Sequence, residues 1–440
     1  MAKKAVKTEA AVWTGRKGDT RGFVQDRFGM FIHWGLYALA ARHEWVKNKE
    51  CITDGQYQKY FDHFDPDLYD PRAWARMAKE AGMKYFVITT KHHEGFCLWN
   101  TEQTDYKAPN TPCGRDLLRP MVEAFRNEGI KVGFYYSLLD WHHPEYPIDK
   151  HHPQRNDPKA REAAKGRDVR KYADYMYRQV EELLTQFGKI DVIWFDFSFA
   201  GEDGKGRDDW QSERLLKMVR KHQPDIVIDD RLDLPNSGDI VTPEQFQPRE
   251  WPMRDGKKAA AWEACQTFSG SWGYYRDELC WRTVDELIRT LIDCVSKGGN
   301  LLLNVGPTSR GEFDYRAVER LKGIGGWMRQ HSRSIYGCTA APADIQCPPD
   351  CRLTYNPETS RLYIHLFAWP YKNIFIDGMK DRIEYAQLLH DGSEVSLQGP
   401  EPWQLESTGG AGISKDTVIM NLPQTPPNTT VPVIELFLKK

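Results

Sequence analysis

Short hydrophobic runs alternate with amphipathic helical patterns along the first three quarters of the chain. Each run is rich in β-branched and aromatic residues and precedes a polar turn and a helical periodicity, which is typical of repeated βα units. Six runs are predicted to be strands: Phe28–Trp34, Tyr85–Lys91, Lys131–Leu138, Asp191–Phe197, Asp225–Arg231 and Asn300–Val305. Two weaker candidates lie near Asp239–Thr242 and Trp262–Cys265.

The intervening helices have recognisable ends. Asp70 is placed to cap one helix with Pro71 at its first position, and Asp116 is placed to cap another. Further helices are predicted over Arg170–Phe187, Asp209–His222 and Val284–Lys297. This α/β alternation predicts a (β/α)8 TIM-like barrel. A doubly wound sheet is less favoured, because no G-x-G-x-x-G pattern follows the first strand and no G-x-x-x-x-G-K-[ST] pattern occurs.

The pattern changes after Tyr336. A Pro-rich irregular stretch leads into short alternating segments that are separated by turn residues, which is typical of antiparallel strands. These segments are Arg361–Phe367, Asn373–Ile376, Arg382–Leu388, Thr417–Asn421 and Val431–Leu438. We therefore predict a barrel domain over residues 1–337 and a C-terminal antiparallel β-sandwich over residues 338–440.

Composition narrows the function classes. The 440 residues include 60 Lys and Arg against 62 Asp and Glu, for a net charge of −2, so nothing favours a nucleic acid or an anionic membrane as partner. No apolar run approaches the roughly 18 residues of a membrane helix. The N-terminus is basic and lacks the apolar region of a signal peptide, which predicts a cytoplasmic protein unless a signal has been removed. The nine cysteines are scattered and odd in number, which favours free thiols over a disulfide framework.

Polar and aromatic residues collect where the predicted strands end. In a βα barrel these carboxyl ends form the mouth of the site. Five consecutive strands each deliver candidates to this rim: His33, His92 and His93, Tyr135 or Tyr136, Trp194 and Asp196, and Arg231. We therefore expect one site at this edge.

Two chemistries could use such a set. His33, His92 and His93 with Asp196 could bind zinc, but two adjacent histidines on an extended strand would point to opposite faces. Alternatively, two carboxylates could flank a glycosidic bond while neutral donors hold sugar hydroxyls. The second interpretation is favoured, with Asp196 as nucleophile and Arg231 able to keep it ionised.

The partner acid remains open from the residues alone. Glu244 follows a short extended run, Glu263 lies in a Trp-Glu-Ala-Cys segment, and Glu250 is a weaker candidate. A general acid needs apolar or like-charged surroundings that raise its pKa, and these depend on the fold. Trp272 could be a sugar platform or a core residue.

Seven ordered segments together resemble the α-L-fucosidases of glycoside hydrolase family 29. They extend across nearly the whole predicted barrel. The segments are Phe28–Gly35, Lys91–Phe96, Gly133–Trp141, Trp194–Asp196, Thr242–Gln245, Trp262–Tyr274 and Val295–Pro307. The C-terminal part resembles the family only in the position of its β-sandwich.

The resemblance implies a retaining hydrolase that needs no cofactor and releases terminal α-L-fucosyl residues from fucosylated oligosaccharides or glycoconjugates. It places the nucleophile on Asp196 and favours Glu244 over Glu263 as acid/base. Further implied substrate-binding residues are His33, Glu44, Trp45, His92, His93, Tyr135, Arg231, Trp194 and Trp272. A metal-dependent barrel hydrolase and a retaining glycosidase for another sugar remain the alternatives. Exposed aromatic loops such as Phe367–Trp369 suggest a homo-oligomer.

Overall fold

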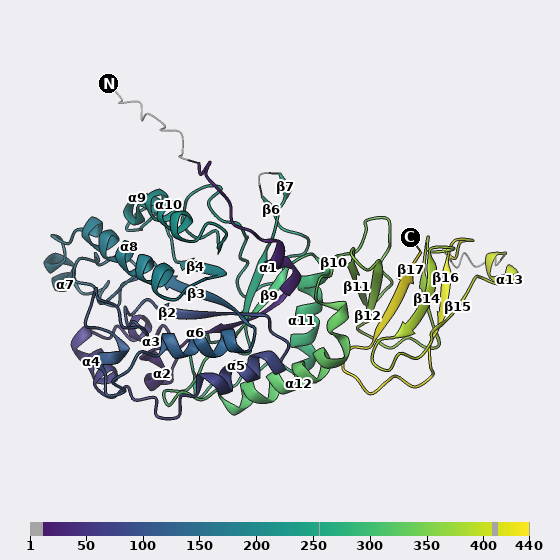
Figure 1. Cartoon of the computed structure of the whole chain (residues 1–440), viewed down its shortest axis with the longest axis horizontal. Helices are drawn as coiled ribbons and strands as arrows, with labels where there is room; N and C mark the ends of the chain where they lie inside the picture. The colour runs from purple at the N-terminus through teal and green to yellow at the C-terminus, as the bar shows by residue number, and fades with distance from the viewer. Residues whose placement is uncertain (1–11, 255, 407–411, 440) are drawn as a thin grey trace, which may run out of the picture.

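A curled sheet of seven parallel strands forms the centre of the computed structural model, which describes residues 12–254, 256–406 and 412–439 (Figure 1). The strand order is β5-β4-β3-β2-β1-β9-β8. The bounds are β1 (Phe28–Ile32), β2 (Tyr85–Lys91), β3 (Lys131–Ser137), β4 (Val192–Asp196), β5 (Val227–Ile228), β8 (Glu263–Thr267) and β9 (Asn300–Val305). All six stronger strand predictions are confirmed in position, although β5 is much shorter than expected.

The gap between β5 and β8, the two edges of this sheet, is bridged by an irregular segment that begins at Asp239. Asp239 N–H donates to the carbonyl of Ile228 at 2.7 Å, and Glu263 N–H donates to the carbonyl of Val241 at 2.9 Å. The strand predicted at Asp239–Thr242 is wrong as a regular strand, because this segment makes an isolated bridge from Val241 to Trp262 in place of a continuous ladder. The seven strands and this segment together form the barrel.

Helices surround the sheet in the order that the βα alternation predicts. Their bounds are α1 (Arg21–Asp26), α2 (Tyr37–Ala40), α3 (Val46–Lys49), α4 (Asp54–Asp62), α5 (Pro71–Glu80), α6 (Leu118–Asn127), α7 (Pro158–Ala163), α8 (Val169–Gln186), α9 (Arg207–Trp210), α10 (Ser212–His222), α11 (Val284–Ser296) and α12 (Tyr315–His331). The Asp70 carboxylate accepts from Arg72 N–H at the N-cap of α5, as predicted. Asp116 lies one residue before the N-cap of α6, which is Leu117, and its carboxylate accepts from Leu118 N–H. Each satisfies an otherwise unpaired amide at a helix start.

Helix α12 was not among the predicted helices. It contains three glycines, Gly323, Gly325 and Gly326, and glycine is a poor helix former. At Gly325 the reason for glycine is steric, because a side chain there would collide with the carbonyl of Glu80 at the end of α5. Close packing of α12 on α5 therefore explains a sequence that weakens the helical pattern.

The C-terminal part is an antiparallel β-sandwich, as predicted. One sheet has the order β10-β11-β12-β17-β14 and the other the order β13-β16-β15. The bounds are β10 (Thr339–Ala340), β11 (Cys351–Asn356), β12 (Arg361–Leu366), β13 (Asn373–Ile376), β14 (Ile383–Leu388), β15 (Ser396–Gln398), β16 (Val418–Asn421) and β17 (Val433–Leu438), with α13 (Pro402–Leu405) beside them. Buried side chains such as Ile364, Ile376 and Met420 fill the space between the sheets.

Helices α11 and α12 lie between the barrel sheet and the sandwich (Figure 1). Trp327 Nε1 donates to the carbonyl of Val431 at 3.0 Å, and Arg352 forms an ion pair with Asp293 at 3.0 Å. The division after residue 337 stays a prediction.

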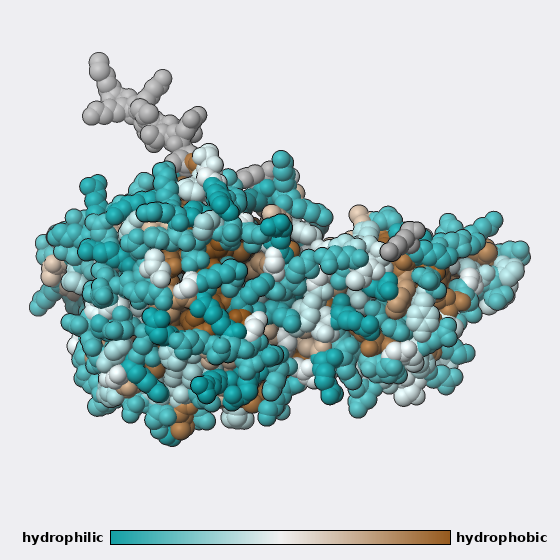
Figure 2. All heavy atoms as spheres, viewed as in Figure 1, coloured by the Kyte–Doolittle hydropathy of each residue, from teal (hydrophilic) through white to brown (hydrophobic). Residues whose placement is uncertain are grey.

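Hydrophilic residues cover most of the face in Figure 2, and hydrophobic residues appear mainly near the middle of the barrel and on the sandwich. No helix in the described part of the chain is long and apolar enough to cross a membrane. Trp369, expected to be exposed, is partly buried, and its Nε1 donates to the carbonyl of Pro423 at 3.3 Å. Self-association stays a prediction.

Candidate active site

The carboxyl ends of the barrel strands surround a small cavity. Its free space, including the open mouth, is about 380 Å³. It is lined by Phe31, His33, Trp45, His92, His93, Tyr135, Trp194, Asp196, Phe197, Arg231, Glu244, Cys265 and Trp272. Of the predicted site residues, only Glu44 and Glu263 are not among these lining residues.

Asp196 is the last residue of β4 and lies at the base of this cavity. Its carboxylate accepts a hydrogen bond from the Tyr135 hydroxyl at 2.7 Å and one from Arg231 Nη1 at 2.8 Å. The next residue, Phe197, has a φ of 80°, a left-handed conformation that is rare for a bulky side chain. The chain therefore turns sharply after the carboxylate and adds the Phe197 ring to the cavity wall.

Glu244 lies close to Asp196 and is more exposed. Arg231 Nη1 contacts Asp196 Oδ1 at 2.8 Å and Glu244 Oε2 at 2.7 Å. Because both contacts end on one nitrogen, these two carboxylate oxygens are at most about 5.5 Å apart, by addition of the two distances. Retaining glycosidases separate their two carboxyl groups by roughly 5–5.5 Å.

Glu263 is buried beneath the cavity wall. It accepts a hydrogen bond from Trp194 Nε1 at 3.1 Å and another from the Tyr85 hydroxyl. Burial raises the pKa of Glu263 to about 7, although both hydrogen bonds oppose the shift. Its carboxyl group therefore contacts the indole of Trp194 and does not line the cavity.

The three predicted histidines lie together on the cavity wall. The prediction that His92 and His93 point to opposite faces is wrong, since both line the cavity and their ring centres are 4.0 Å apart. β2 ends at Lys91, and its register with β3 shifts between Thr89 and Lys91, so side-chain alternation no longer applies beyond the strand.

Within β3 the alternation does hold. Tyr135 faces the cavity, whereas the Tyr136 hydroxyl donates to Gln179 on α8 at 2.8 Å, on the opposite side of the sheet. The choice of Tyr135 over Tyr136 therefore agrees with the strand geometry.

Aromatic rings form much of the remaining wall. Trp194 lies under the Arg231 guanidinium, whose central carbon is 4.5 Å from the ring centre. Trp272 lies 5.1 Å from His33 between ring centres. The Glu44 carboxylate accepts from the backbone N–H groups of Trp272 and Gly273 at 3.1 and 2.9 Å. Glu44 therefore fixes the loop that carries Trp272.

Sequence reasoning missed three cavity residues, Phe31, Phe197 and Cys265. Phe31 could have been found, because it precedes His33 by two positions on the same strand and such residues share a face. Phe197 and Cys265 carry no comparable signal, since an aromatic or thiol group beside a strand end is usually a core residue.

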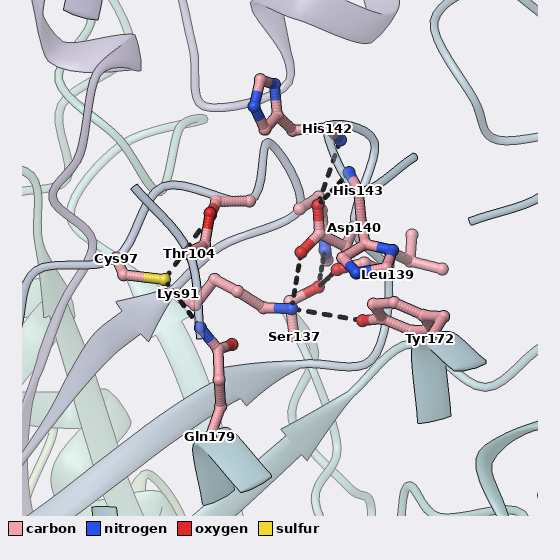
Figure 3. A network of polar contacts seen from close by, with 12 residues as sticks. Lys91, Cys97, Thr104, Ser137, Leu139, Asp140, His142, His143, Tyr172 and Gln179 are labelled. Atoms are coloured by element: carbon pink, nitrogen blue, oxygen red, sulfur yellow. Dashed lines mark hydrogen bonds and ion pairs between the residues drawn. The ribbon is translucent and has the colours of Figure 1, made fainter. Parts of the chain in front are cut away.

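A buried ion pair lies beside the loop that follows β3 (Figure 3). Lys91 Nζ contacts the Asp140 carboxylate and the Tyr172 hydroxyl, at 3.0 and 3.2 Å. Asp140 also accepts from the backbone N–H groups of His142 and His143, at 3.0 and 2.9 Å. These contacts hold the backbone that follows β3.

No three His, Cys, Asp or Glu side chains among the described residues are arranged to share a metal ion. Instead, two carboxylates that share one Arg231 nitrogen, with these oxygens no more than about 5.5 Å apart, face a cavity of polar and aromatic groups. A barrel with this site defines a glycoside hydrolase. A family model for α-L-fucosidase matches residues 5–333, so the chain belongs to the α-L-fucosidase family, glycoside hydrolase family 29.

Relatives and solved structures agree with this assignment. The chain is 29% identical to an α-L-fucosidase of Dictyostelium discoideum, over 93% of this chain and 90% of that protein. α-L-Fucosidase isoenzyme 1 from Paenibacillus thiaminolyticus is 45% identical with a TM-score of 0.88, over 96% of this chain and 99% of that one.

A Bacteroides thetaiotaomicron α-L-fucosidase, trapped as a covalent intermediate from 2-fluoro-fucosyl fluoride in a glutamate-to-glutamine mutant, is 28% identical with a TM-score of 0.82. The structural match covers 98% of this chain and 99% of the Bacteroides chain. The chain is thus an α-L-fucosidase, a retaining hydrolase that removes terminal α-L-fucosyl residues.

Proposed function

We propose that Asp196 is the nucleophile and Glu244 the general acid and base of this hydrolysis. In the first step an Asp196 oxygen bonds to the anomeric carbon, the bond from that carbon to the glycosidic oxygen breaks, and Glu244 gives its proton to the departing oxygen. In the second step water attacks the same carbon, Glu244 takes up the proton of that water, and Asp196 leaves as a carboxylate. Two inversions give retention.

The observation that carries this proposal is the single Arg231 nitrogen shared by the two carboxylates. It keeps their nearest oxygens within about 5.5 Å, so one sugar ring can meet both groups. The guanidinium also offsets the cost of holding the Asp196 charge in a poorly solvated place. The covalent intermediate of the Bacteroides relative, trapped in a glutamate mutant, supports a separate nucleophile and acid in this fold.

Access to the cavity supports Glu244 over Glu263 as the acid, although it is Glu263 whose pKa burial raises. Glu244 lines the cavity and its side chain is 40% exposed, so it can reach the oxygen that joins the sugar to the rest of the glycan. Glu263 is fully buried and engaged by Trp194 and Tyr85. Its proposed role is to orient Trp194 below the sugar.

The remaining cavity residues suit a small deoxy sugar. His33, His92 and His93 offer polar contacts to ring hydroxyls, while Trp194 and Trp272 offer apolar surface to the C6 methyl group. Trp45 also lines the cavity. The proposed role of Glu44 is indirect, through the backbone of the Trp272 loop.

The decisive experiment replaces the nucleophile and then supplies a substitute. Asp196→Gly should lose hydrolysis of an aryl α-L-fucoside, because no group can attack the anomeric carbon. Added azide should occupy the vacated space, displace the aryl group with inversion and give β-L-fucosyl azide. Sodium chloride at equal ionic strength is the control. Hydrolysis that persists in Asp196→Gly without azide would contradict the assignment, and a chelator should leave the wild-type rate unchanged.

A further inference from the structure

We propose that Ser137 and Asn304 are positioning residues that hold His93 and His33 as Nδ1–H tautomers, so that each ring presents Nε2 to the sugar as a hydrogen-bond acceptor. The proposal rests on the proposed function of the cavity and adds the direction of its hydrogen bonds. The tautomers follow because the carbonyl and amide oxygens at the ends of these hydrogen-bond chains can only accept hydrogen bonds.

The first chain of hydrogen bonds starts at the carbonyl of Leu139, which can only accept. The Ser137 hydroxyl lies 2.7 Å from it and therefore donates its single proton there (Figure 3). The same hydroxyl oxygen lies 2.7 Å from His93 Nδ1. Because its proton is already used, Ser137 must accept in this contact, and His93 Nδ1 must carry a hydrogen.

The second chain starts at the carbonyl of Trp272. The Asn304 side-chain Nδ2 donates to it at 2.6 Å, which fixes the orientation of the amide. The Asn304 Oδ1 atom then lies 2.6 Å from His33 Nδ1. An amide oxygen can only accept, so His33 Nδ1 also carries a hydrogen.

The other ring nitrogen of each histidine is then a lone pair when the ring is neutral. Burial lowers the pKa of His93, and the neighbouring His92, His33 and Lys91 lower it further. Burial and His92 also lower the pKa of His33. His93 Nε2 lies 3.9 Å from Asp196 Oδ2, which is too long for a hydrogen bond and leaves the lone pair available.

Two consequences follow for recognition. A sugar hydroxyl at His93 Nε2 must donate its proton, so a fluorine at that carbon, which can only accept, cannot replace it. The same hydroxyl oxygen remains free to accept from another group. Ser137 and Asn304 would thus determine which polar pattern the cavity accepts without touching the sugar themselves.

The test compares Ser137→Ala with Ser212→Ala. Ser212 is also buried and its hydroxyl donates to a backbone carbonyl at 2.7 Å, that of Leu232, but no imidazole contacts it. With 4-nitrophenyl α-L-fucoside, Ser137→Ala should lower kcat/KM by about 10- to 100-fold, and Ser212→Ala by less than about threefold.

Substrate analogues separate a tautomer effect from simple loosening. One analogue carries hydrogen and another carries fluorine in place of the hydroxyl that His93 binds, at C3 or at C4. Because neither analogue can donate to Nε2, the wild type should lose the same factor in kcat/KM with each, relative to the normal fucoside. Ser137→Ala should reduce that discrimination by about tenfold. Equal losses for Ser137→Ala and Ser212→Ala, or unchanged discrimination, would overturn the proposal.

A spectroscopic readout is independent of catalysis. In the ligand-free wild type labelled with ¹⁵N-histidine, the His93 resonances, assigned by their loss in His93→Gln, should show a protonated Nδ1 and a bare Nε2. Ser137→Ala should mix the two tautomers. A protonated Nε2 in the wild type would refute the inference even if Asp196 proves to be the nucleophile, and the expected shifts would stand even if it does not.

Discussion

Two aspartates lie at the carboxyl ends of neighbouring strands, and their surroundings differ sharply. Asp140, after β3, is 1% exposed and is surrounded by Lys91 and two backbone N–H groups. Asp196, at the end of β4, is 9% exposed, receives two side-chain hydrogen bonds and faces a cavity.

The difference separates a structural carboxylate from a reactive one. The protein satisfies Asp140 completely, and although burial raises its pKa, Lys91 and the nearby histidines outweigh that effect and leave the pKa lowered. Asp196 also has a cationic partner, Arg231, but lines the cavity. Access, rather than charge pairing, distinguishes the two sites.

The largest expected effect comes from removing the charge that faces the cavity. Asp196→Asn should lower kcat for an aryl α-L-fucoside by on the order of 10⁴- to 10⁶-fold, because the amide is a poor nucleophile. Its melting temperature should stay close to that of the wild type. Asp314→Asn is the matched control, since Asp314 also pairs with an arginine, Arg316, but does not line the cavity. Similar losses in both variants would contradict the contrast.

Breaking the buried Lys91–Asp140 pair should instead lower the stability of the protein. Lys91→Met leaves the Asp140 charge without its cation and should lower the free energy of unfolding by about 3–5 kcal/mol, measured by denaturant titration. Lys91→Met combined with Asp140→Asn should recover part of this loss, because no unpaired charge remains. Wild-type stability in the single variant would show that the pair is not structural.

The acid/base assignment predicts a loss that depends on the leaving group. Glu244→Gln should lower kcat/KM for a natural fucosylated oligosaccharide by about 10²–10⁴-fold, and much less for an aryl fucoside whose leaving group needs no proton. Glu263→Gln, with similar chemistry but no access to the cavity, should lack this dependence. The reverse pattern would move the acid to Glu263.

Glu263 also predicts a pH effect on stability. Its pKa rises from 4.5 to about 7 on burial, so the folded state binds more protons than the unfolded state between these values. The free energy of unfolding should therefore fall as pH rises from about 4.5 to about 7, by up to about 3 kcal/mol. Glu263→Gln should lose this contribution and become the more stable protein at pH 8. If the free energies of unfolding of the wild type and Glu263→Gln changed with pH in the same way, this prediction would be wrong.

Much of the fold followed from hydrophobic periodicity, because strands buried on both faces and capped helices leave strong local patterns. The eighth strand did not, since the segment after Asp239 pairs through isolated bridges, from Val241 to Trp262 and from Glu244 to Cys265, and forms no regular ladder. Helix α12 did not either, because three glycines weaken its pattern, and one of them, Gly325, is required by close packing against Glu80.

The site was predictable where the regular geometry of a strand fixes the direction of a side chain. Asp196 ends a regular strand, which predicts it at the cavity, and side-chain alternation along β3 predicts Tyr135 there in preference to Tyr136. The direction of His93 depends on how the chain leaves β2, and the burial of Glu263 depends on contacts with β2 and β4. Such long-range packing has no local sequence signal.

The most direct test of the nucleophile is to trap its bond to the sugar. Wild-type protein incubated with 2-deoxy-2-fluoro-α-L-fucosyl fluoride should gain one fluorofucosyl group, and peptide mass spectrometry should find it on Asp196. Asp196→Asn should remain unlabelled. A fluorofucosyl group on Glu244, Asp230 or any residue other than Asp196 would contradict the account.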